Sequence, residues 1–277
     1  MRKSFLCLML LFLTLVSACA TSPTGRRQLM LVSEQQAISA SREAYLETMA
    51  PLKKEGKLNT DPRLDQRVKK ITGRLVAQAV KMRPDSAKWE WSVGVIDDPE
   101  MVNAWCMAGG RMAIYTGLIS KVDPTDDELA QVMGHEIAHA LANHTAEKMS
   151  IAMATQMGVF VAGVSSDRPA LAMSTAAVAA TLAIGLPNSR TAESEADRIG
   201  IELAAKAGYN PYAAASLWQK MAQVGGSRMP EFLSTHPAPE NRMQRLNELA
   251  PQMMGFYQAP GERPIYPLHE PLGATAP

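Results

Sequence analysis

The stretch Met133–His144, MGHEIAHALANH, holds three of the five histidines in a chain of 277 residues. Just before it, the segment Thr125–Glu128 (TDDE) has the S/T-x-x-E pattern of a capping box. This pattern predicts a helix that begins there and runs on through the histidines. On such a helix His135 and His139 lie about 40° apart around the axis and about 6 Å apart along it, so their imidazoles share a face. His144 points the opposite way and is expected to be structural.

His135, Glu136 and His139 form the pattern HExxH, which offers zinc two imidazole ligands and places a carboxylate beside them. Catalytic zinc sites use three protein ligands and keep the fourth position for water. A third ligand must therefore come from another part of the chain.

The segment SRTAESEADRIG, residues 189–200, is the candidate source of that ligand. On a helix Glu193 and Asp197 share a face, whereas Glu195 points elsewhere. Apolar residues flank that face, so we expect both carboxylates to be partly buried and to need a cationic partner. Helical spacing alone does not separate Glu193 from Asp197 as the third ligand.

HEIAH followed by this acidic segment resembles the zinc metalloprotease family that includes HtpX, BepA and LoiP, gluzincin-type peptidases of the bacterial envelope. NAWCMAGGRMAIYTGLI (103–119) and STHPAPENR (234–242) resemble two further blocks of that family. The resemblance covers most of residues 30–250. It implies a zincin-like domain of the α+β class, mostly helical, with a small β-sheet beside the HExxH helix and one zinc ion per chain.

The resemblance also implies a role for each residue of the pattern. His135, His139 and Glu193 correspond to the metal ligands, and Glu136 to the general base. Asp197 corresponds to an aspartate next to the ligands that is sometimes assigned as a proton donor.

Two further sets of candidates come from the other blocks. His236 resembles a family histidine that can approach the zinc in a closed state. It could block the water position, help to bind the transition state or pack its loop, and the sequence does not decide between these roles. A strand predicted over 109–119 could pair with an extended peptide if it is a sheet edge, which makes Asn103, Gly109 and Gly110 substrate-strand candidates.

Residues 1–18 have the layout of an export signal, with a basic start, an apolar run and small residues at its end. The apolar run is shorter than the roughly 20 residues that a membrane-spanning helix requires. Val16–Cys19 (VSAC) resembles a bacterial lipobox, which implies cleavage before Cys19 and lipidation of that cysteine. Ala20, which follows it, suggests sorting to the outer membrane.

The rest of the chain is expected to divide into a lipidated N-terminus and tether (19–32), a zinc metallopeptidase domain (33–254) and a flexible, Pro- and Gly-rich tail (255–277). Periodicity predicts helices over 33–49 and 64–82 and a strand over 89–96. Within residues 151–186, the apolar part Leu171–Leu186 is only sixteen residues long and rich in Ala, Ser and Thr, which disfavours a helix that spans the bilayer. We expect a helical hairpin beside the active site, where it could touch the membrane surface. The one cysteine left over, Cys106, is expected to be a buried thiol.

Charge excludes one class of partner, because removal of residues 1–18 leaves 26 basic and 27 acidic side chains and no basic run that would suit nucleic acid. The sequence predicts a zinc endopeptidase, lipid-anchored on the periplasmic face of the envelope, that cleaves unfolded or envelope proteins. The alternative is a non-proteolytic envelope assembly factor or chaperone with a structural metal. Glu136 favours the peptidase, since a structural site needs no general base.

Overall fold

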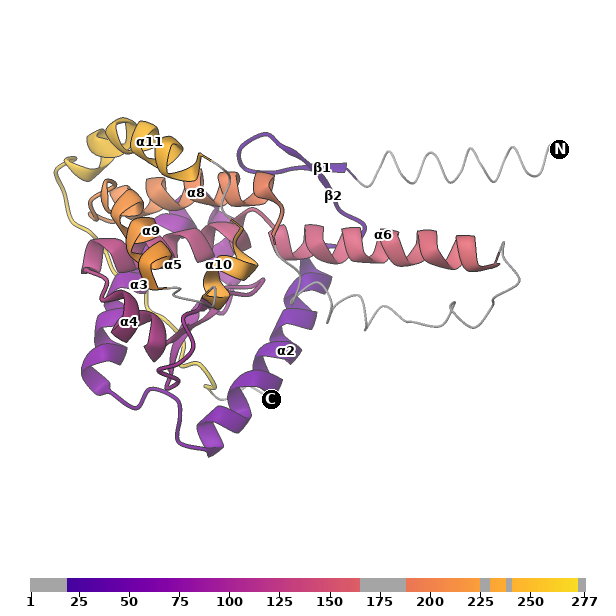
Figure 1. Cartoon of the computed structure of the whole chain (residues 1–277), viewed down its shortest axis with the longest axis horizontal. Helices are drawn as coiled ribbons and strands as arrows, with labels where there is room; N and C mark the ends of the chain where they lie inside the picture. The colour runs from indigo at the N-terminus through magenta and orange to yellow at the C-terminus, as the bar shows by residue number, and fades with distance from the viewer. Residues whose placement is uncertain (1–18, 165–187, 225–229, 238–240, 274–277) are drawn as a thin grey trace. The chain divides into compact units, whose positions relative to one another are not determined.

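The structure is a computed structural model that describes residues 19–164, 188–224, 230–237 and 241–273 (Figure 1). The chain divides into two units, one made of Met1–Ala37 with Asn143–Leu186 and the other of Ile38–Ala142 with Pro187–Pro277. The predicted export signal lies outside the described residues, and so does the part of the predicted hairpin after residue 164. All the candidate metal ligands belong to the larger unit.

Two long helices open the larger unit and confirm the helices predicted from periodicity. Helix α2 spans Glu34–Lys54 and α3 spans Pro62–Met82. The start of α3 is fixed by Asp61, whose side chain accepts hydrogen bonds from the backbone N–H groups of Arg63 and Leu64. Proline at the first helical position costs nothing there, because that N–H has no partner within the helix.

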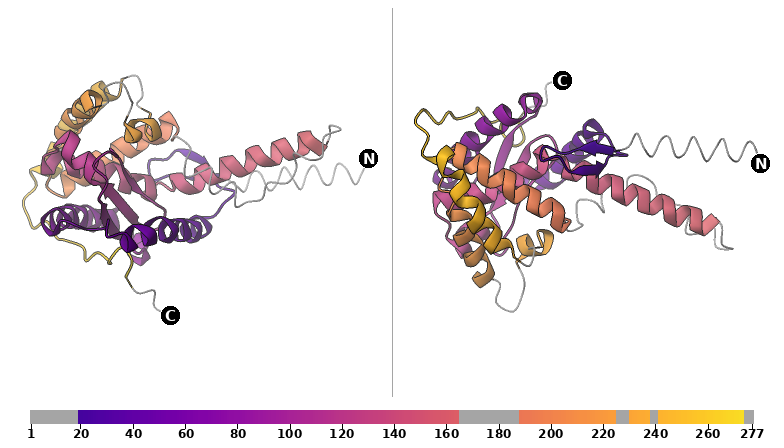
Figure 2. Two further views of the ribbon diagram at one scale, coloured as in Figure 1. Left: turned by 60° about the horizontal axis from the view of Figure 1, so that its bottom comes forward. Right: turned by 90° about the horizontal axis from the view of Figure 1, so that it is seen from above.

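A three-stranded sheet follows, in the order β3-β5-β4. Its strands are among the purple and magenta arrows of Figure 2. Strand β3 (Ser92–Ile96) runs parallel to β5 (Arg111–Tyr115), and β4 (Ala104–Cys106) runs antiparallel to β5. The predicted strand over 89–96 begins only at Ser92, because residues 89–91 link the short 3-10 helix η1 (Pro84–Lys88) to β3 without regular structure. The predicted strand over 109–119 ends at Tyr115, and helix α4 (Thr116–Val122) takes over.

The alternation of side chains along the strands gives the sheet two packed faces. Val93, Val95, Met112 and Ile114 join the main hydrophobic core with residues of α3 and of the HExxH helix. On the opposite face, Ile96 and Ala113 pack with residues of α2, namely Tyr45 and Met49. The sheet is therefore buried on both sides.

The strand after the glycine pair, β5, is the middle strand of the sheet, so the condition under which it could pair with a peptide is not met. Gly109 and Gly110 instead make the turn between β4 and β5, with φ of +85° and +84°. A Cβ at Gly110 would lie 2.5 Å from the ring of Trp91, so only glycine fits there. Among the described strands of this sheet, β4 is the edge that contacts the HExxH helix.

The HExxH helix is α5, Asp126–Leu141, and its capping box is present as predicted. The Thr125 hydroxyl accepts the N–H of Glu128, and the Glu128 carboxylate accepts the N–H of Thr125. The prediction that one helix runs on through His144 is wrong, because α5 ends at Leu141 and Asn143 adopts a left-handed φ of 56°. His144 begins a second helix, α6 (His144–Val164).

In the described part of the larger unit, four further helices follow (Figure 1). They are α8 (Arg190–Lys206), α9 (Ala213–Val224), α10 (Glu231–Thr235) and α11 (Arg242–Tyr257). The start of α8 is capped by Ser189, whose hydroxyl accepts the N–H of Ala192. Helix α8 packs along α5, and α11 packs on α8.

Helices α5 and α8 touch through their backbones. A Cβ at Gly200 of α8 would lie 2.8 Å from the backbone nitrogen of His135, and one at Gly134 of α5 would lie 2.9 Å from the carbonyl oxygen of Gly200. These distances leave no room for a methyl group on either helix. The glycine pair therefore brings α8 closer to the HExxH turn than larger residues would allow.

The segment after α11, whose composition predicted a flexible tail, makes defined backbone contacts. The N–H of Tyr266 donates to the carbonyl of Gly73 on α3, and the N–H of His269 donates to the carbonyl of Trp91. His269 also forms a bridge with Ser92, so this segment runs alongside the free side of β3.

The smaller unit contains a hairpin where the sequence predicted a polar tether. Strands β1 (Cys19–Thr21) and β2 (Arg27–Leu29) pair antiparallel. Next to the hairpin, Arg26 forms a two-pronged ion pair of 2.6 and 2.7 Å with Glu147 of α6. These contacts tie the hairpin to the first turns of α6.

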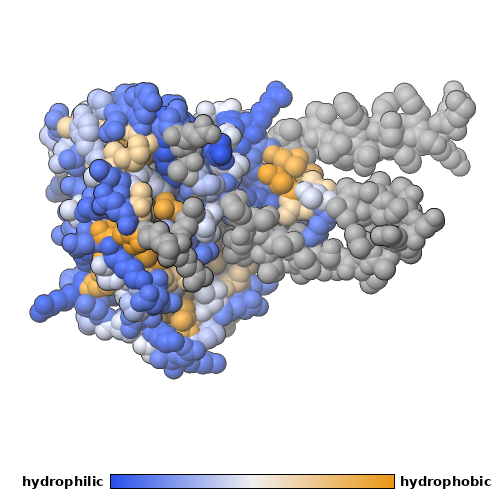
Figure 3. Space-filling model, in the orientation of Figure 1, coloured by the Kyte–Doolittle hydropathy of each residue, from blue (hydrophilic) through white to orange (hydrophobic). Residues whose placement is uncertain are grey.

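None of the helices in the described residues combines the length and apolar character needed to cross a bilayer. The face drawn in Figure 3 is mostly hydrophilic, with small apolar patches. Isolated apolar side chains are ordinary on a protein surface and do not by themselves indicate a binding site.

We expect Gly200→Ala to lower the free energy of unfolding by about 1–3 kcal/mol, because the new methyl group would press on the backbone of α5. Gly255→Ala is the matched control, since Gly255 lies in α11 and a Cβ there would meet nothing within 4 Å. Alanine favours helix over glycine by roughly 0.5–1 kcal/mol, so this control should be slightly stabilising. Chemical denaturation of both variants measures the difference, and equal effects would contradict a tight crossing.

Candidate metal centre

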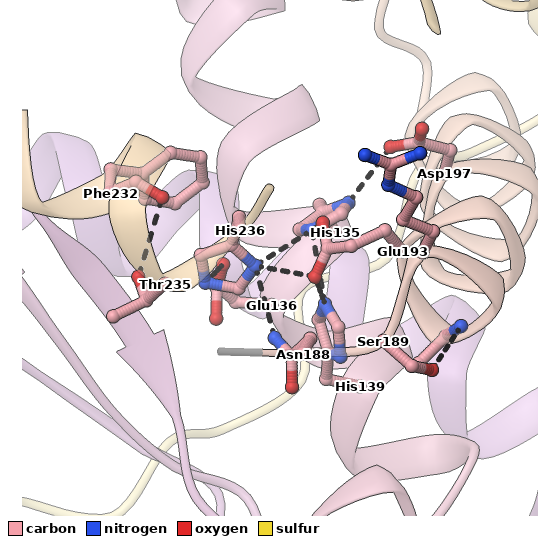
Figure 4. A network of polar contacts seen from close by, with 12 residues as sticks. His135, Glu136, His139, Asn188, Ser189, Glu193, Asp197, Phe232, Thr235 and His236 are labelled. Carbon is pink, nitrogen blue, oxygen red and sulfur yellow. Dashed lines mark hydrogen bonds and ion pairs between the residues drawn. The ribbon is translucent and has the colours of Figure 1, made fainter. Parts of the chain in front are cut away.

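Four buried side chains bring their ligand atoms to one point in the larger unit (Figure 4). His135 and His139 come from successive turns of α5, Glu193 from the first turn of α8, and His236 directly follows α10. Their candidate ligand atoms all lie within 4.8 Å of one another. Sequence spacing predicted the two histidines, and the family resemblance implied Glu193 and His236. The fold brings these two residues to the histidines from segments far away in the chain.

The spacing of these atoms fits a zinc ion. The Nε2 atoms of His135 and His139 are 3.0 Å apart, and Nε2 of His135 lies 3.2 Å from Glu193 Oε2. Nδ1 of His236 lies 3.0 Å from Glu193 Oε1 and 3.3 Å from His135 Nε2. Tetrahedral zinc with bonds of about 2.0–2.2 Å separates its ligand atoms by about 3.3 Å, close to these values. Two or three imidazoles and one carboxylate are also the donors that zinc prefers.

The electrostatics of the centre favour a positive charge among these atoms. Burial alone would lower the pKa of His135, but the charge of Glu193 and hydrogen bonds with Asp197 and Glu193 raise that pKa to about 9. Burial would raise the pKa of Glu193, but His135 and His139 hold it far below its usual range. Glu193 Oε2 is buried and accepts no hydrogen bond, although His135 Nε2 lies 3.2 Å and the Arg242 guanidinium 3.4 Å from it. A buried carboxylate oxygen that accepts no hydrogen bond is suited to bind a metal cation.

Glu136 lies beside the ligands but is not one of them. Its carboxylate accepts a hydrogen bond from the backbone of Cys106 on β4, while Oε1 has no hydrogen-bond donor and lies 3.4 Å from His236 Nε2. Burial raises the pKa of Glu136, against the opposing effects of His236 and His135. Cys106 is buried, as expected, and burial followed by the charge of Glu136 raises the pKa of its thiol.

Asp197 lies one turn after Glu193 on α8, on the far side of the His135 ring. Its Oδ1 is 3.1 Å from His135 Nδ1 and 2.5 Å from the Arg242 guanidinium. Burial would raise the pKa of Asp197, but Arg242 and His135 keep that pKa below its usual value. The structure thus separates the two acidic residues that helical spacing had left equivalent, since Glu193 faces the ligand atoms and Asp197 faces the outer nitrogen of His135.

Arg242 and Asn188 are residues of this centre that the sequence analysis did not single out; Asn188 Nδ2 lies 3.3 Å from His236 Nδ1, and Arg242 contacts Asp197. Arg242 is the last residue of the block STHPAPENR, so the signal was present in a segment already singled out. It begins α11, which α8 and α9 contact, and this packing brings it to Asp197. Nothing in the residue spacing connects it to the histidines more than 100 positions earlier.

The other predicted site residues do not join the metal-ligand group. Glu195 is buried elsewhere on α8, and His144 is buried at the start of α6. Asn103 stands just before the edge strand β4, and its carbonyl accepts the N–H of Tyr115. Gly109 and Gly110 belong to the β4–β5 turn.

Residues 62–250 match the peptidase family described as "Peptidase family M48". "Metalloendopeptidase OMA1, mitochondrial" from Homo sapiens is 34% identical over 243 residues, which cover 83% of this chain and 45% of that protein. "Beta-barrel assembly-enhancing protease" from Escherichia coli K12 is 30% identical over 210 residues, which cover 71% of this chain and 42% of that protein.

"Mitochondrial metalloendopeptidase OMA1" from Arabidopsis thaliana is 36% identical over 158 residues, 56% of this chain and 31% of that protein. The chain spans about half the length of the curated relatives it matches. The matched residues 62–250 include the sheet, the HExxH helix and the whole metal-ligand group. The chain therefore belongs to peptidase family M48.

Proposed function

We propose that this chain is a zinc-dependent endopeptidase of the bacterial cell envelope. The observation that carries this proposal is the convergence of His135, His139 and Glu193 next to a buried carboxylate, Glu136, which is held by the sheet edge. Family membership and the names of the relatives, which are metalloendopeptidases and a protease, support peptide-bond hydrolysis.

His135, His139 and Glu193 would hold the zinc ion. When bound, zinc supplies Lewis acidity, which polarises a carbonyl and lowers the pKa of water. Asp197 accepts the Nδ1 proton of His135, so that the lone pair of Nε2 faces the other ligands. The chain thereby fixes both the direction and the protonation state of its first histidine.

Glu136 performs the proton transfers. Its Oε1 is free of hydrogen-bond donors and can take the proton of the attacking water. The backbone of Cys106 holds the carboxylate in place during this step. Glu136 then delivers the proton to the leaving amine as the peptide bond breaks.

The substrate is expected to bind as an extended strand against β4. This strand is the sheet edge beside α5, and its residue Cys106 contacts Glu136, so a peptide paired with β4 would pass the general base. Backbone pairing gives affinity with little demand on side-chain identity. That property suits unfolded or envelope proteins as substrates.

The centre is closed in this structure, since Glu136 is only 2% exposed and Glu193 is fully buried. Helix α10 covers it, held by a hydrogen bond from the N–H of Phe232 to the carbonyl of Val102, just before β4. At the other end of α10, the N–H of Asn188 donates to the carbonyl of Thr235. We propose that His236 completes the ligand set in this closed state, and that substrate binding displaces α10 and His236 together.

The proposed location follows from the N-terminal sequence. Export and cleavage before Cys19 would leave a lipid-anchored chain on the periplasmic face, and Ala20 favours the outer membrane. Two of the relatives described above carry mitochondrial names, which concern those proteins. The anchor therefore rests on the lipobox pattern.

Glu136→Gln is expected to keep zinc but to lower the rate of casein hydrolysis by about 10²–10⁴-fold, because the amide cannot accept the water proton. His139→Ala should lose both zinc and activity, while Glu195→Gln, also on a buried helical face, should keep both. Zinc content by atomic absorption and casein cleavage measure these outcomes. Full activity of Glu136→Gln would show that Glu136 is not the general base. Zinc-bound wild type that cleaves no casein would instead favour the alternative role, an assembly factor or chaperone with a structural metal.

We expect His236→Ala to raise basal proteolysis severalfold with zinc content unchanged, because it removes a donor that competes with water and substrate. His269→Ala is the matched control, since His269 is an exposed histidine beside β3. Turnover of a short fluorogenic peptide measures the effect. Reduced or unchanged activity with zinc intact would show that His236 does not block the centre.

Cys19→Ala is expected to abolish incorporation of a labelled fatty acid and to release the protein from the membrane fraction of a bacterial host. Cys106→Ala should leave labelling intact, because that thiol is buried. Labelling of the Cys19 variant at the wild-type level would overturn the lipid anchor without affecting the proposed activity.

A further inference from the structure

Arg242 is a buried cation whose hydrogen-bonding capacity is poorly used. The residue is 3% exposed, and its Nε and one terminal nitrogen make no hydrogen bond. Its guanidinium lies over the ring of Trp218 from α9, 3.3 Å from the ring centroid. Burying a charge without full pairing is costly, so such a residue calls for an explanation beyond packing.

The contacts of the guanidinium point toward His135. One terminal nitrogen lies 2.5 Å from Asp197 Oδ1 and 3.3 Å from His135 Nδ1, and the other lies 3.4 Å from Glu193 Oε2. Asp197 Oδ1 is also 3.1 Å from His135 Nδ1. One carboxylate oxygen of Asp197 is therefore shared between the guanidinium and the imidazole.

The role of Arg242 in this arrangement is fixed by chemistry, and the role of His135 follows when its Nε2 serves as the metal ligand. Arginine has only donors, so it must donate to Asp197. With Asp197 as the acceptor, the nearest available donor for its other contact is Nδ1–H of His135. That tautomer leaves Nε2 with its lone pair, directed at His139 and Glu193. The 3.3 Å contact between Arg242 and His135 Nδ1 then brings two donors close together. Their repulsion is offset because both donate to the same Asp197 oxygen.

We propose that Arg242 is a positioning residue that acts through Asp197, locking the carboxylate so that it holds His135 in the metal-binding tautomer and orientation. Stacking on Trp218 fixes the orientation of the guanidinium, so that it donates to Asp197. The inference rests on the proposed metal site but not on proteolysis.

The positive charge of Arg242 also balances negative charge in the buried centre. Glu136, Glu193 and Asp197 bring three negative charges into one buried region. A zinc ion and one guanidinium together supply three positive charges, so the centre is balanced when Arg242 is present. Loss of the guanidinium would leave one buried negative charge without a partner.

The first test compares zinc affinity, measured by competition with a chromophoric chelator, between wild type, Arg242→Gln and Arg245→Gln. Arg245 is the matched control because it lies on the same helix and binds Ser194 of α8 at 2.6 Å, on the exposed side. We expect Arg242→Gln to bind zinc about 10–100-fold more weakly, as is usual when a partner of a ligating histidine is lost. Arg245→Gln should match wild type.

Arg242→Lys should recover part of the affinity, because lysine restores the charge but lacks the planar fork and the stacking surface. The absorption bands of cobalt-substituted protein should shift in both Arg242 variants and stay unchanged in Arg245→Gln. Thermal unfolding of the metal-free proteins checks folding. If Arg242→Gln does not fold, Arg242→Lys carries the test, and wild-type zinc affinity with wild-type cobalt bands in that variant would overturn the proposal.

A double-mutant cycle with Asp197→Asn tests the route. If Arg242 acts through Asp197, the double variant should bind zinc no more weakly than the single variant with the lower zinc affinity. The reason is that both changes break the same connection from Arg242 through Asp197 to His135. Additive losses would overturn action through Asp197. Wild-type protein that binds no zinc would refute the proposed function, whereas wild-type binding with unaffected Arg242 variants would refute only this inference.

Discussion

The close crossing of α5 and α8 is the constraint on which the metal centre depends. Gly134 and Gly200 let the two backbones meet at a separation that no methyl group would permit. Without that contact the short side chain of Glu193 would stop short of the two histidines, because a glutamate reaches only a few ångströms from its helix. The crossing also sets Asp197, one turn further on, against the outer nitrogen of His135. One steric relation between two helices therefore places both carboxylates.

The centre combines carboxylates that burial would otherwise neutralise. Three acidic side chains lie at most 9% exposed within one region, and each depends on cations or hydrogen-bond donors supplied by other elements. Histidines of α5 lower the pKa of Glu193, and the guanidinium that begins α11 lowers the pKa of Asp197. A bound dication adds to the same balance. The same packing of α5, α8 and α11 that forms the core therefore also places the charges that compensate the buried carboxylates.

The sheet and α10 control access to that centre. Strand β4 presents its edge beside α5 and holds Glu136 through the backbone of Cys106. Helix α10 is hydrogen-bonded to the chain just before β4 and carries His236 into the ligand group. Substrate pairing and release of His236 would therefore involve the same neighbouring surfaces, which offers a physical link between peptide binding and opening of the site.

The sequence by itself determined the local features, because helical periodicity and capping act over a few residues. It determined that α5 begins with a Thr125–Glu128 capping box, that His135 and His139 share one face, and that Cys106 is buried. Resemblance to the family added Glu193 as the third ligand. Only the tertiary structure decided that β5 is the middle strand, that α5 stops before His144, and that Arg242 joins the centre. The end of α5 depends on the left-handed Asn143, which is a local stop signal that the helical pattern alone did not reveal. The strand order and the place of Arg242 depend on contacts between segments far apart in the chain, and no local pattern of residues encodes which distant surfaces will pack together.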